Sequence, residues 1–401
     1  MRCAKFVVLL LFFLCGKALC QQIELSPAAQ VSILTVGTAD ELYAKFGHSA
    51  IRIHDPTLGL DVVYNYGLFD FSDPNFYTKF TRGKLDYRLG RQQFDAFLYG
   101  YELENRWVKE QVLDLSLPER KSLLQFLENN YLPENRYYKY DFLFDNCSTR
   151  VPDALKRVLG PKLKFNYKHL SDHYTFRQLI HQNLELNSWS NFGIDLALGA
   201  VIDNRATPWQ HLFLPIYVFK QLPHTTLHGH PLVSGERTLF EERPVGRTSN
   251  LLATPMFWLA LLLLFVVVIT FLDHKKNSRA RWLDFLLFLV TGAAGFLILF
   301  LWWGTDHTAT ANNFNALWAF APNLLAAFCL LRKNRLPIWF KYYLITVLGL
   351  LVLTLIIWVF AIQSFSPLIG FVILALALRY GYLLKGDFYR EEIAKPALQD
   401  P

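Results

Sequence analysis

The sequence predicts an α+β domain outside the cytoplasm, followed by an all-α membrane domain of five transmembrane helices. Three observations support this fold class. With 53% hydrophobic residues and 34 Phe among 401 residues, the chain is too apolar for one ordinary soluble domain. The N-terminus has the pattern of an export signal. The C-terminal part holds five apolar segments separated by short polar loops.

The first 20 residues are typical of a signal peptide that is cut after Cys20. Arg2 and Lys5 precede an apolar run, and Ala18 and Cys20 place small residues at the positions that the signal peptidase requires. Large or charged residues before the cysteines of this stretch argue against a lipobox. An uncleaved membrane anchor is the alternative, which the short apolar core disfavours.

The five apolar segments are each close to the roughly 20 residues that cross a bilayer. The third is short and contains Pro322 and Asn323, and Arg379 near the end of the fifth is expected to extend towards the cytoplasm. The segments are 252–272, 283–303, 315–331, 342–362 and 366–384.

Basic residues indicate which side each loop occupies. Lys and Arg gather at 275–281 and 332–341, whereas the loops 304–313 and 363–366 contain neither residue. By the positive-inside rule the soluble domain lies outside and the C-terminus lies in the cytoplasm. The chain has a net charge of +7, and much of its excess of Lys and Arg lies in the two basic loops. We therefore expect no nucleic-acid partner.

The chain therefore divides into a signal peptide, an exported domain, a polar linker, the membrane domain and a cytoplasmic tail. The predicted boundaries are 1–20, 21–233, 234–251, 252–384 and 385–401. Within the exported domain, alternating apolar residues predict strands, and helical spacing with end signals predicts helices. Ser116 and Glu119 predict a capping box before the second long helix. The expected strands are 31–36, 48–54, 62–66 and 108–115, and the expected helices are 39–46, 93–106, 117–131 and 153–159.

Cys147 is the first candidate for chemistry. Of the five cysteines, three lie in the signal peptide and Cys329 lies in an apolar segment, so Cys147 has no disulfide partner on the exported side. A lone thiol in an oxidising compartment favours a nucleophile. The alternative is a buried small hydrophobe, which the polar neighbours Asp145, Asn146 and Ser148 disfavour.

A cysteine nucleophile needs a histidine within hydrogen-bond reach. His48 follows Gly47 at the head of the strand 48–54, which is a rigid place to hold a ring. His54 lies on the same strand but borders a turn, so we expect it to be exposed. A satisfied or surface histidine is the alternative for His48.

Four motifs resemble one known family. They are Phe46–Arg52, which contains Phe-Gly-His, Tyr64–Gly67, Asp145–Arg150, which contains Asp-Asn-Cys, and Gly193–Asp195. Together they resemble the periplasmic domain of the Lnb-type bacterial lipoprotein N-acyltransferases, in which the domain precedes a five-helix membrane region. A histidine ahead of the cysteine also resembles the circularly permuted papain-like fold of permuted NlpC/P60 proteins and lecithin:retinol acyltransferase relatives.

The resemblance implies an enzyme of the bacterial inner membrane that moves a fatty acyl chain from a phospholipid donor to a lipoprotein acceptor. Cys147 would hold the chain as a thioester, and His48 would act as base and then as acid in a ping-pong cycle. The acceptor would be the α-amino group of a diacylglyceryl-cysteine. The alternatives are a membrane-anchored cysteine hydrolase that cuts peptidoglycan peptides or phospholipids, and a receptor or scaffold with a vestigial site.

Further residues are candidates for the site. Asn65 is a candidate to orient His48. Arg150 is a candidate to meet a phosphate or an oxyanion, with a surface role or an ion-pair role as the alternative. Asp145 and Asn146 are candidates to shape the turn and donate to the oxyanion, with helix capping as the alternative. Since no metal motif or cofactor fingerprint occurs, we expect no metal and no cofactor.

Two groups of residues are candidates for contact with lipid. His307, with Asn315 and Asn323, is a candidate for a headgroup site at the outer boundary, with capping and helix–helix hydrogen bonds as the alternative. An aromatic run is a candidate for a shield that excludes water, although we expect most of it to be core. The run is Tyr64, Tyr66, Phe69, Phe71, Phe76, Tyr77 and Phe80.

Overall fold

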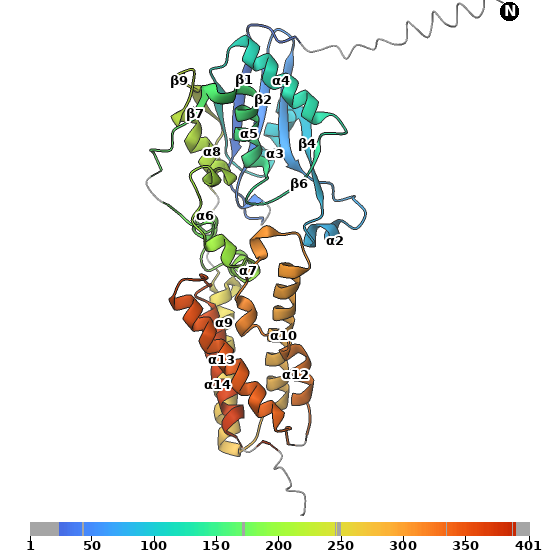
Figure 1. The fold of residues 1–401 in the computed structure, drawn as a ribbon, viewed down its shortest axis with the longest axis vertical. Coiled ribbons are helices and arrows are strands. Elements are labelled where there is room, and N and C mark those ends of the chain that lie inside the picture. The colour runs from blue at the N-terminus through green and yellow to red at the C-terminus, as the bar shows by residue number, and fades with distance from the viewer. Residues whose placement is uncertain are drawn as a thin grey trace, which may run out of the picture.

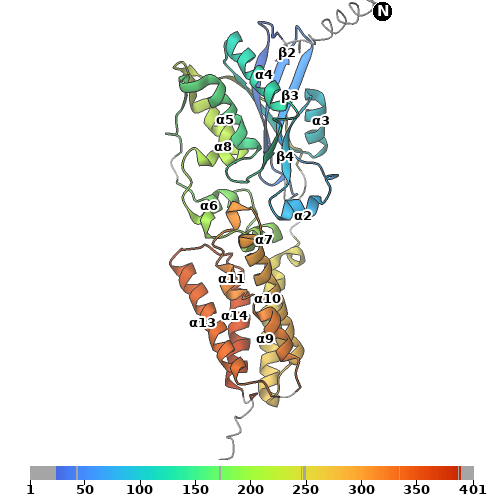
Figure 2. The same cartoon turned by 45° about the vertical axis from the view of Figure 1, so that its right-hand side comes forward.

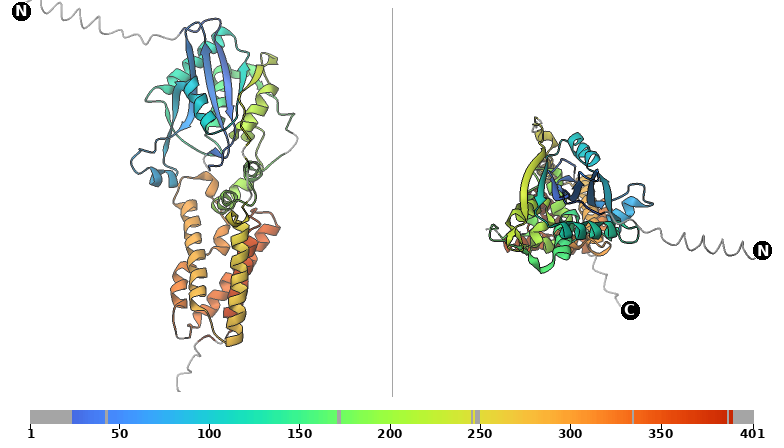
Figure 3. Two further views of the ribbon diagram at one scale, coloured as in Figure 1. Left: turned by 180° about the vertical axis from the view of Figure 1, so that it is seen from behind. Right: turned by 90° about the horizontal axis from the view of Figure 1, so that it is seen from above.

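The structure, a computed structural model, describes residues 24–389 except 42–43, 171–172, 245, 247–249, 334 and 387. The predicted signal peptide, nearly all of the predicted tail and part of the predicted helix 39–46 lie outside the described residues. A soluble domain of strands and helices stands end to end on a helical bundle (Figure 1, Figure 3).

A seven-stranded antiparallel sheet forms the centre of the soluble domain, in the order β10-β5-β1-β2-β3-β4-β6. Its strands are Gln30–Val36 (β1), His48–Asp55 (β2), Leu60–Leu68 (β3), Asp86–Gln93 (β4), Val108–Leu113 (β5), Tyr137–Lys139 (β6) and Val233–Phe240 (β10). A second, three-stranded sheet joins Leu163–Phe165 (β7), Thr225–Leu227 (β8) and His230–Pro231 (β9).

Helices cover both faces of the large sheet. Every residue of β1 after Gln30 is buried, which is typical of a strand covered on both sides. Leu117–Tyr131 (α4), Cys147–Leu159 (α5) and Pro215–Gln221 (α8) cover one face, and Phe94–Leu103 (α3) covers the other (Figure 2). The shorter helices are Phe76–Thr81 (α2), Phe176–His181 (α6) and Trp189–Ala197 (α7), with one-turn helices at Gly160–Lys162 (η2), Ala200–Asp203 (η3), Gln210–Phe213 (η4), Leu222–His224 (η5), Leu251–Ala253 (η6) and Thr308–Thr310 (η7).

The local predictions for this domain are largely confirmed. The predicted strands correspond to β1, β2, β3 and β5, and the predicted helices 93–106 and 117–131 correspond to α3 and α4. The capping box of Ser116 and Glu119 is present. The helix predicted from Asp153 begins earlier, at Cys147, because the Asn146 side chain accepts hydrogen bonds from the first turn.

The predicted linker 234–251 is wrong in its first half, because Val233–Phe240 is strand β10 at the edge of the sheet. Its exposed polar residues suggested a linker, yet polar side chains are also what an edge strand carries. Glu236 accepts a hydrogen bond from Gln111 at 3.1 Å, and Arg237 donates to Glu110 at 2.5 Å.

The membrane domain contains three helices that are long and apolar enough to cross a bilayer, within the described part of the chain: Pro255–Lys276 (α9), Arg281–Trp303 (α10) and Trp339–Val359 (α13). The predicted segment 315–331 is broken into Asn315–Trp318 (α11) and Asn323–Leu330 (α12), and Ile369–Lys385 (α14) has 17 residues.

Two glycines of α10 explain how the break between α11 and α12 packs. A Cβ at Gly295 would lie 1.8 Å from the carbonyl oxygen of Ala319, and a Cβ at Gly292 would lie 2.1 Å from the amide nitrogen of Leu324. The irregular backbone beside Pro322 is therefore pressed against a helix surface that only glycine can form.

The prediction that Arg379 extends towards the cytoplasm is wrong, because its side chain is fully buried in the bundle. Its Nε donates to Asp284 at 2.6 Å, and one Nη donates to Asp273 at 2.7 Å. Its other Nη donates to Thr270 at 3.2 Å. Two carboxylates, one from α9 and one from α10, thus hold the guanidinium inside the protein. Pairing lowers the free-energy cost of placing a charged group within the membrane.

We expect Arg379→Ala to lower the free energy of unfolding by about 3–5 kcal/mol, because it leaves the buried carboxylate of Asp273 without its cation and Asp284 with Arg279 alone, at 3.5 Å. Thermal unfolding in detergent micelles measures this as a lower melting temperature. The matched control is Lys276→Ala, an exposed cation at the end of α9. Equal melting temperatures for the two variants would contradict a structural role of the Arg379 cluster.

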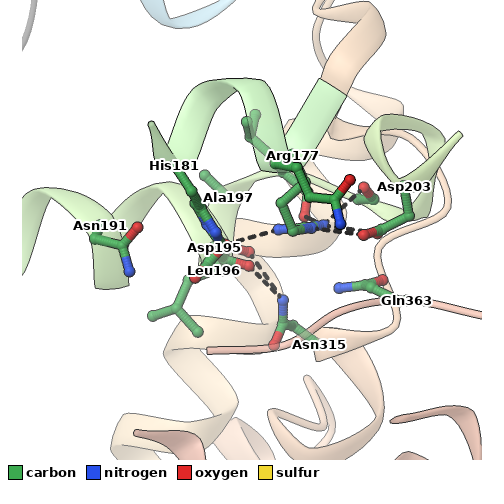
Figure 4. Close-up of polar contacts among 12 residues, drawn as sticks. Arg177, His181, Asn191, Asp195, Leu196, Ala197, Asp203, Asn315 and Gln363 are labelled. Carbon is green, nitrogen blue, oxygen red and sulfur yellow. Dashed lines mark hydrogen bonds and ion pairs between the residues drawn. The ribbon is translucent and has the colours of Figure 1, made fainter. Parts of the chain in front are cut away.

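The two domains meet at a buried polar network (Figure 4). Arg177 of α6 donates to Asp195 of α7 at 2.8 Å and to Asp203 of η3 at 2.9 Å. From the membrane domain, Asn315 donates to the backbone carbonyl of Asp195 at 2.9 Å, and Asn313 donates to that of Leu196 at 2.8 Å. The soluble domain is therefore attached to the outer end of the bundle by hydrogen bonds as well as by the chain.

Candidate active site

His48, Asn65 and Cys147 come from three different elements. His48 begins β2, Asn65 lies in the neighbouring strand β3, and Cys147 is the first residue of α5, which packs on the same sheet. Gly47 has φ of +79°, and a Cβ there would lie 2.7 Å from the carbonyl oxygen of Val36. The backbone can therefore turn into β2 with His48 at its head only because residue 47 is glycine.

The structure brings these three side chains into contact. His48 Nε2 donates to Asn65 Oδ1 at 2.5 Å. The side chain of His48 also forms a hydrogen bond with Cys147. Since Nε2 faces Asn65, Nδ1 is the nitrogen that can exchange a proton with the thiol. Cys147 and His48 are both half-buried.

The surroundings of Cys147 favour a thiolate. Burial raises the pKa of Cys147, but the charge of His48, its hydrogen bond and the backbone N–H groups of Ser49 and Ser148 outweigh burial, so the pKa falls below its ordinary value. The position at the start of α5, where the helix dipole is positive, acts in the same direction.

The surroundings of His48 favour the imidazolium. Burial lowers the pKa of His48, but the charge of the Cys147 thiolate and hydrogen bonds to Cys147 and Asn65 outweigh burial, so the pKa rises above its ordinary value. Both shifts favour a thiolate–imidazolium pair, the form in which a cysteine acts as a nucleophile.

Asn146 holds the start of α5 in place. Its Oδ1 accepts from the amides of Ser148 and Thr149 at 2.7 and 2.9 Å, and its Nδ2 donates to the carbonyls of Phe142 and Phe213 at 2.7 and 2.9 Å. Both N–H bonds of the amide are therefore used, which leaves none for an oxyanion. The capping alternative is the one that the contacts support.

Asp145 and Arg150 form an ion pair beside the site. The Nε of Arg150 donates to one carboxylate oxygen of Asp145, and one Nη of Arg150 donates to the other oxygen at 2.6 Å. The guanidinium also lies over the ring of Tyr138, at 4.1 Å from its centroid. Arg150 therefore has the ion-pair role that was the alternative for it. About a quarter of its side chain is exposed.

Tyr66 and His307 are engaged elsewhere. Tyr66 is buried in the core, and its hydroxyl accepts from Asn130 at 3.0 Å. His307 Nε2 donates to the carbonyls of Phe80 and Thr81 at 3.2 and 3.1 Å. Asn323 makes a helix–helix hydrogen bond, since it donates to Thr291 at 3.0 Å.

Sequence reasoning missed the residues that line the thiol. Gly67 has φ of +89°, and a Cβ there would lie 3.4 Å from the Cβ of Cys147 and 3.9 Å from Tyr138 and Tyr140. The Tyr138 hydroxyl is buried, and none of the residues that the structure describes forms a hydrogen bond with it. The glycine at the end of Tyr64–Gly67 and the tyrosines shortly before Cys147 were the available signals.

Two family models match the chain. The model described as the Lnb N-terminal periplasmic domain matches residues 21–182, and the model described as the Lnb transmembrane domain matches residues 247–388. The chain belongs to the Lnb family. Together the two matched regions cover more than half of the chain, and the first contains all three contacting residues. No curated protein and no solved structure matches this chain at a significant level.

The pKa shifts in this Lnb-family protein predict how Cys147 reacts with iodoacetamide. The midpoint of the alkylation rate against pH should lie below the ordinary pKa of a cysteine thiol, because the pKa of Cys147 is lowered. His48→Ala removes the positive charge and the hydrogen bond, so burial then dominates and the midpoint should move to higher pH.

Mass spectrometry of the modified peptides separates Cys147 from Cys329, the other free cysteine of the described residues. The same midpoint in wild type and in His48→Ala would show that His48 does not control the thiol.

Proposed function

We propose that this protein is a lipoprotein N-acyltransferase. It moves a fatty acyl chain from a membrane phospholipid through a Cys147 thioester to the α-amino group of a diacylglyceryl-cysteine lipoprotein. The observation that carries the proposal is the contact of a half-buried, unpaired thiol with His48, in an Lnb-family domain attached to the end of an apolar helix bundle.

In the first half-reaction, the sulfur of Cys147 attacks the ester carbonyl of the phospholipid, and a C–S bond forms. His48 gives its proton to the glycerol oxygen as the C–O bond breaks, so a lysophospholipid leaves. The thiolate–imidazolium pair supplies both the nucleophile and this proton.

In the second half-reaction, the lipoprotein amine attacks the thioester. His48, now neutral, takes a proton from the amine, the C–N bond forms and the C–S bond breaks. The thiolate and the imidazolium return together, so the cycle needs no metal and no cofactor. Asn65 is proposed to hold the His48 ring so that Nδ1 faces the sulfur throughout.

The arrangement in the membrane is part of the proposal. All five apolar segments cross the bacterial inner membrane, the soluble domain is a periplasmic, circularly permuted papain-like domain, and the C-terminus is cytoplasmic. In support, the two basic loops lie together at the end of the bundle remote from the soluble domain, where Arg279 donates to the carbonyl of Arg332 at 2.9 Å. Donor and acceptor both reside in the bilayer, so this attachment raises their effective concentration at the site.

A membrane-anchored cysteine hydrolase is the alternative, because the same three side chains can pass an acyl group to water. The attachment of the site to the bundle through buried hydrogen bonds supports the transferase, since a hydrolase of soluble peptides needs only a tether.

We expect Cys147→Ala and His48→Ala to abolish transfer, because the first removes the nucleophile and the second the proton carrier. The purified proteins are incubated in vesicles with acyl-labelled phospholipid and a synthetic diacylglyceryl lipopeptide, and mass spectrometry follows the label. Without acceptor, wild type should carry a hydroxylamine-sensitive acyl group on Cys147. Cys329→Ser is the control and should retain activity.

Label that reaches the peptide amine in the Cys147→Ala protein would defeat the proposal. Label that passes to water in wild type would identify the hydrolase.

Asn65→Ala should lower kcat for transfer on the order of 100-fold, with little change in KM, because a misplaced His48 ring costs rate and not binding. Asn65→Asp keeps an acceptor oxygen and adds negative charge, which raises the pKa of His48. Its activity should therefore largely return, with the alkaline limb of the pH–rate profile moved to higher pH. A rise in KM alone, or no rescue by Asp, would argue against a positioning role.

A further inference from the structure

The short helix α2 and the turn before it, residues 69–75, reach the outer end of the membrane bundle. Figure 1 and Figure 2 show α2 at the lower edge of the soluble domain, beside the top of α10. The amide of Asp306 donates to the carbonyl of Arg82 at 2.9 Å, and His307 donates to the carbonyls of Phe80 and Thr81. The loop after α10 therefore fixes the height of α2 relative to the bundle.

The side of α2 that these contacts leave free is aromatic. Phe71, Tyr77 and Phe80 are 69%, 78% and 50% exposed; we call them the α2 aromatic patch. Trp303, the last residue of α10, is 72% exposed and precedes Asp306 by only three positions. Exposed aromatic rings at the end of a transmembrane helix mark the boundary between lipid and water, so the patch lies at that boundary.

Aromatic rings continue inward from the patch to the thiol. The centroids of Phe80 and Phe76 are 6.0 Å apart, those of Phe76 and Phe69 are 5.7 Å apart, and those of Phe69 and Tyr87 are 5.5 Å apart. Tyr87 stacks on Tyr140 at 4.3 Å. Tyr140 lies 3.9 Å from the place that a Cβ of Gly67 would occupy, and the Cβ of Cys147 lies 3.4 Å from the same place. These five rings, Phe80, Phe76, Phe69, Tyr87 and Tyr140, form the ring series.

A cavity of about 560 Å³ lies beside the ring series, and Phe69, Pro74 and Tyr137 form its apolar side. Its charged lining consists of Lys79, Arg88, Asp70, Asp73 and Asp86, and Lys79 forms an ion pair with Asp73. The Nε of Arg88 is buried, and no hydrogen-bond partner for it occurs in the described part of the chain. Because three carboxylates outnumber the two basic groups, the lining does not select a phosphate, whereas its apolar side suits a hydrocarbon chain.

We propose that the α2 aromatic patch inserts into the outer surface of the bilayer and that the ring series leads one acyl chain of a phospholipid from there to Cys147. The route rests on the proposed function, whereas the insertion does not. When the acyl chain leaves the bilayer it loses its lipid neighbours, and the apolar rings replace them. The rings also exclude water from the thioester.

Insertion is tested without any reaction. Tyr77→Cys is labelled with an environment-sensitive fluorophore in a Cys147→Ser, Cys329→Ser protein and reconstituted in phosphatidylethanolamine vesicles that contain brominated lipid. The label should be quenched. The matched control is Leu58→Cys, which is 50% exposed in the turn between β2 and β3, at the opposite end of these strands from His48. Equal quenching at the two positions would overturn the insertion.

The route is tested by substrate length. Combined Phe71→Ser, Tyr77→Ser and Phe80→Ser should lower transfer from vesicle phospholipid by about tenfold or more, while turnover of a water-soluble short-chain ester and alkylation of Cys147 remain within about twofold. Phe69→Gln, which leaves the patch intact, should reduce long-chain transfer more than short-chain turnover. Tyr99→Ser, 61% exposed on α3, is the control and should change neither.

Unchanged vesicle activity in the triple variant, or an equal loss on long and short donors in Phe69→Gln, would overturn the route. If Cys147→Ala still transfers label, the proposed function fails, yet the quenching result still decides the insertion.

Discussion

The contact between the thiol of Cys147 and the ring of His48 is the interaction on which the site depends, and it requires two rigid supports. Gly47 allows the chain to turn so that His48 begins β2. Asn146 ties the first turn of α5 to Phe142 and Phe213, and Ser148 donates to Leu212 at 2.8 Å. The first residue of β2 and the first turn of α5 are thus fixed against each other. In this arrangement the half-buried Cys147 and His48 can stabilise each other's charged form.

The junction with the membrane domain holds the domain that carries this contact against the end of the apolar helix bundle. Arg177 and Asp195 are nearly completely buried, and the backbone around Asp195 accepts hydrogen bonds from Asn313 and Asn315. A second contact joins Thr308 to Asp141, in the loop that precedes Cys147, at 2.7 Å. His307 and Thr308 of the outer loop hold α2 and the loop before Cys147 at a set height above the bundle.

The aromatic run shows how one composition serves two purposes. Tyr64, Tyr66 and Phe76 are buried, as expected of core. Phe71, Tyr77 and Phe80 are exposed, because α2 leaves the sheet and no other part of the described chain covers its outer side. Residues 62–66 of β3 are all buried, whereas beyond β3 the chain leaves the packed sheet and these three rings lie on the surface.

The sequence by itself determined whatever depends on near neighbours: the strands β1 to β3, the capping box before α4, the long apolar helices, and the isolation of Cys147 from other cysteines. These follow from side-chain period, end signals and segment length, which a short window contains. Only the tertiary structure decided that 233–240 is an edge strand, that Arg379 is paired inside the bundle, and that Gly67, Tyr138 and Tyr140 surround the thiol. Each of these depends on residues that are distant in the chain and become neighbours only through packing, so no local pattern encodes them.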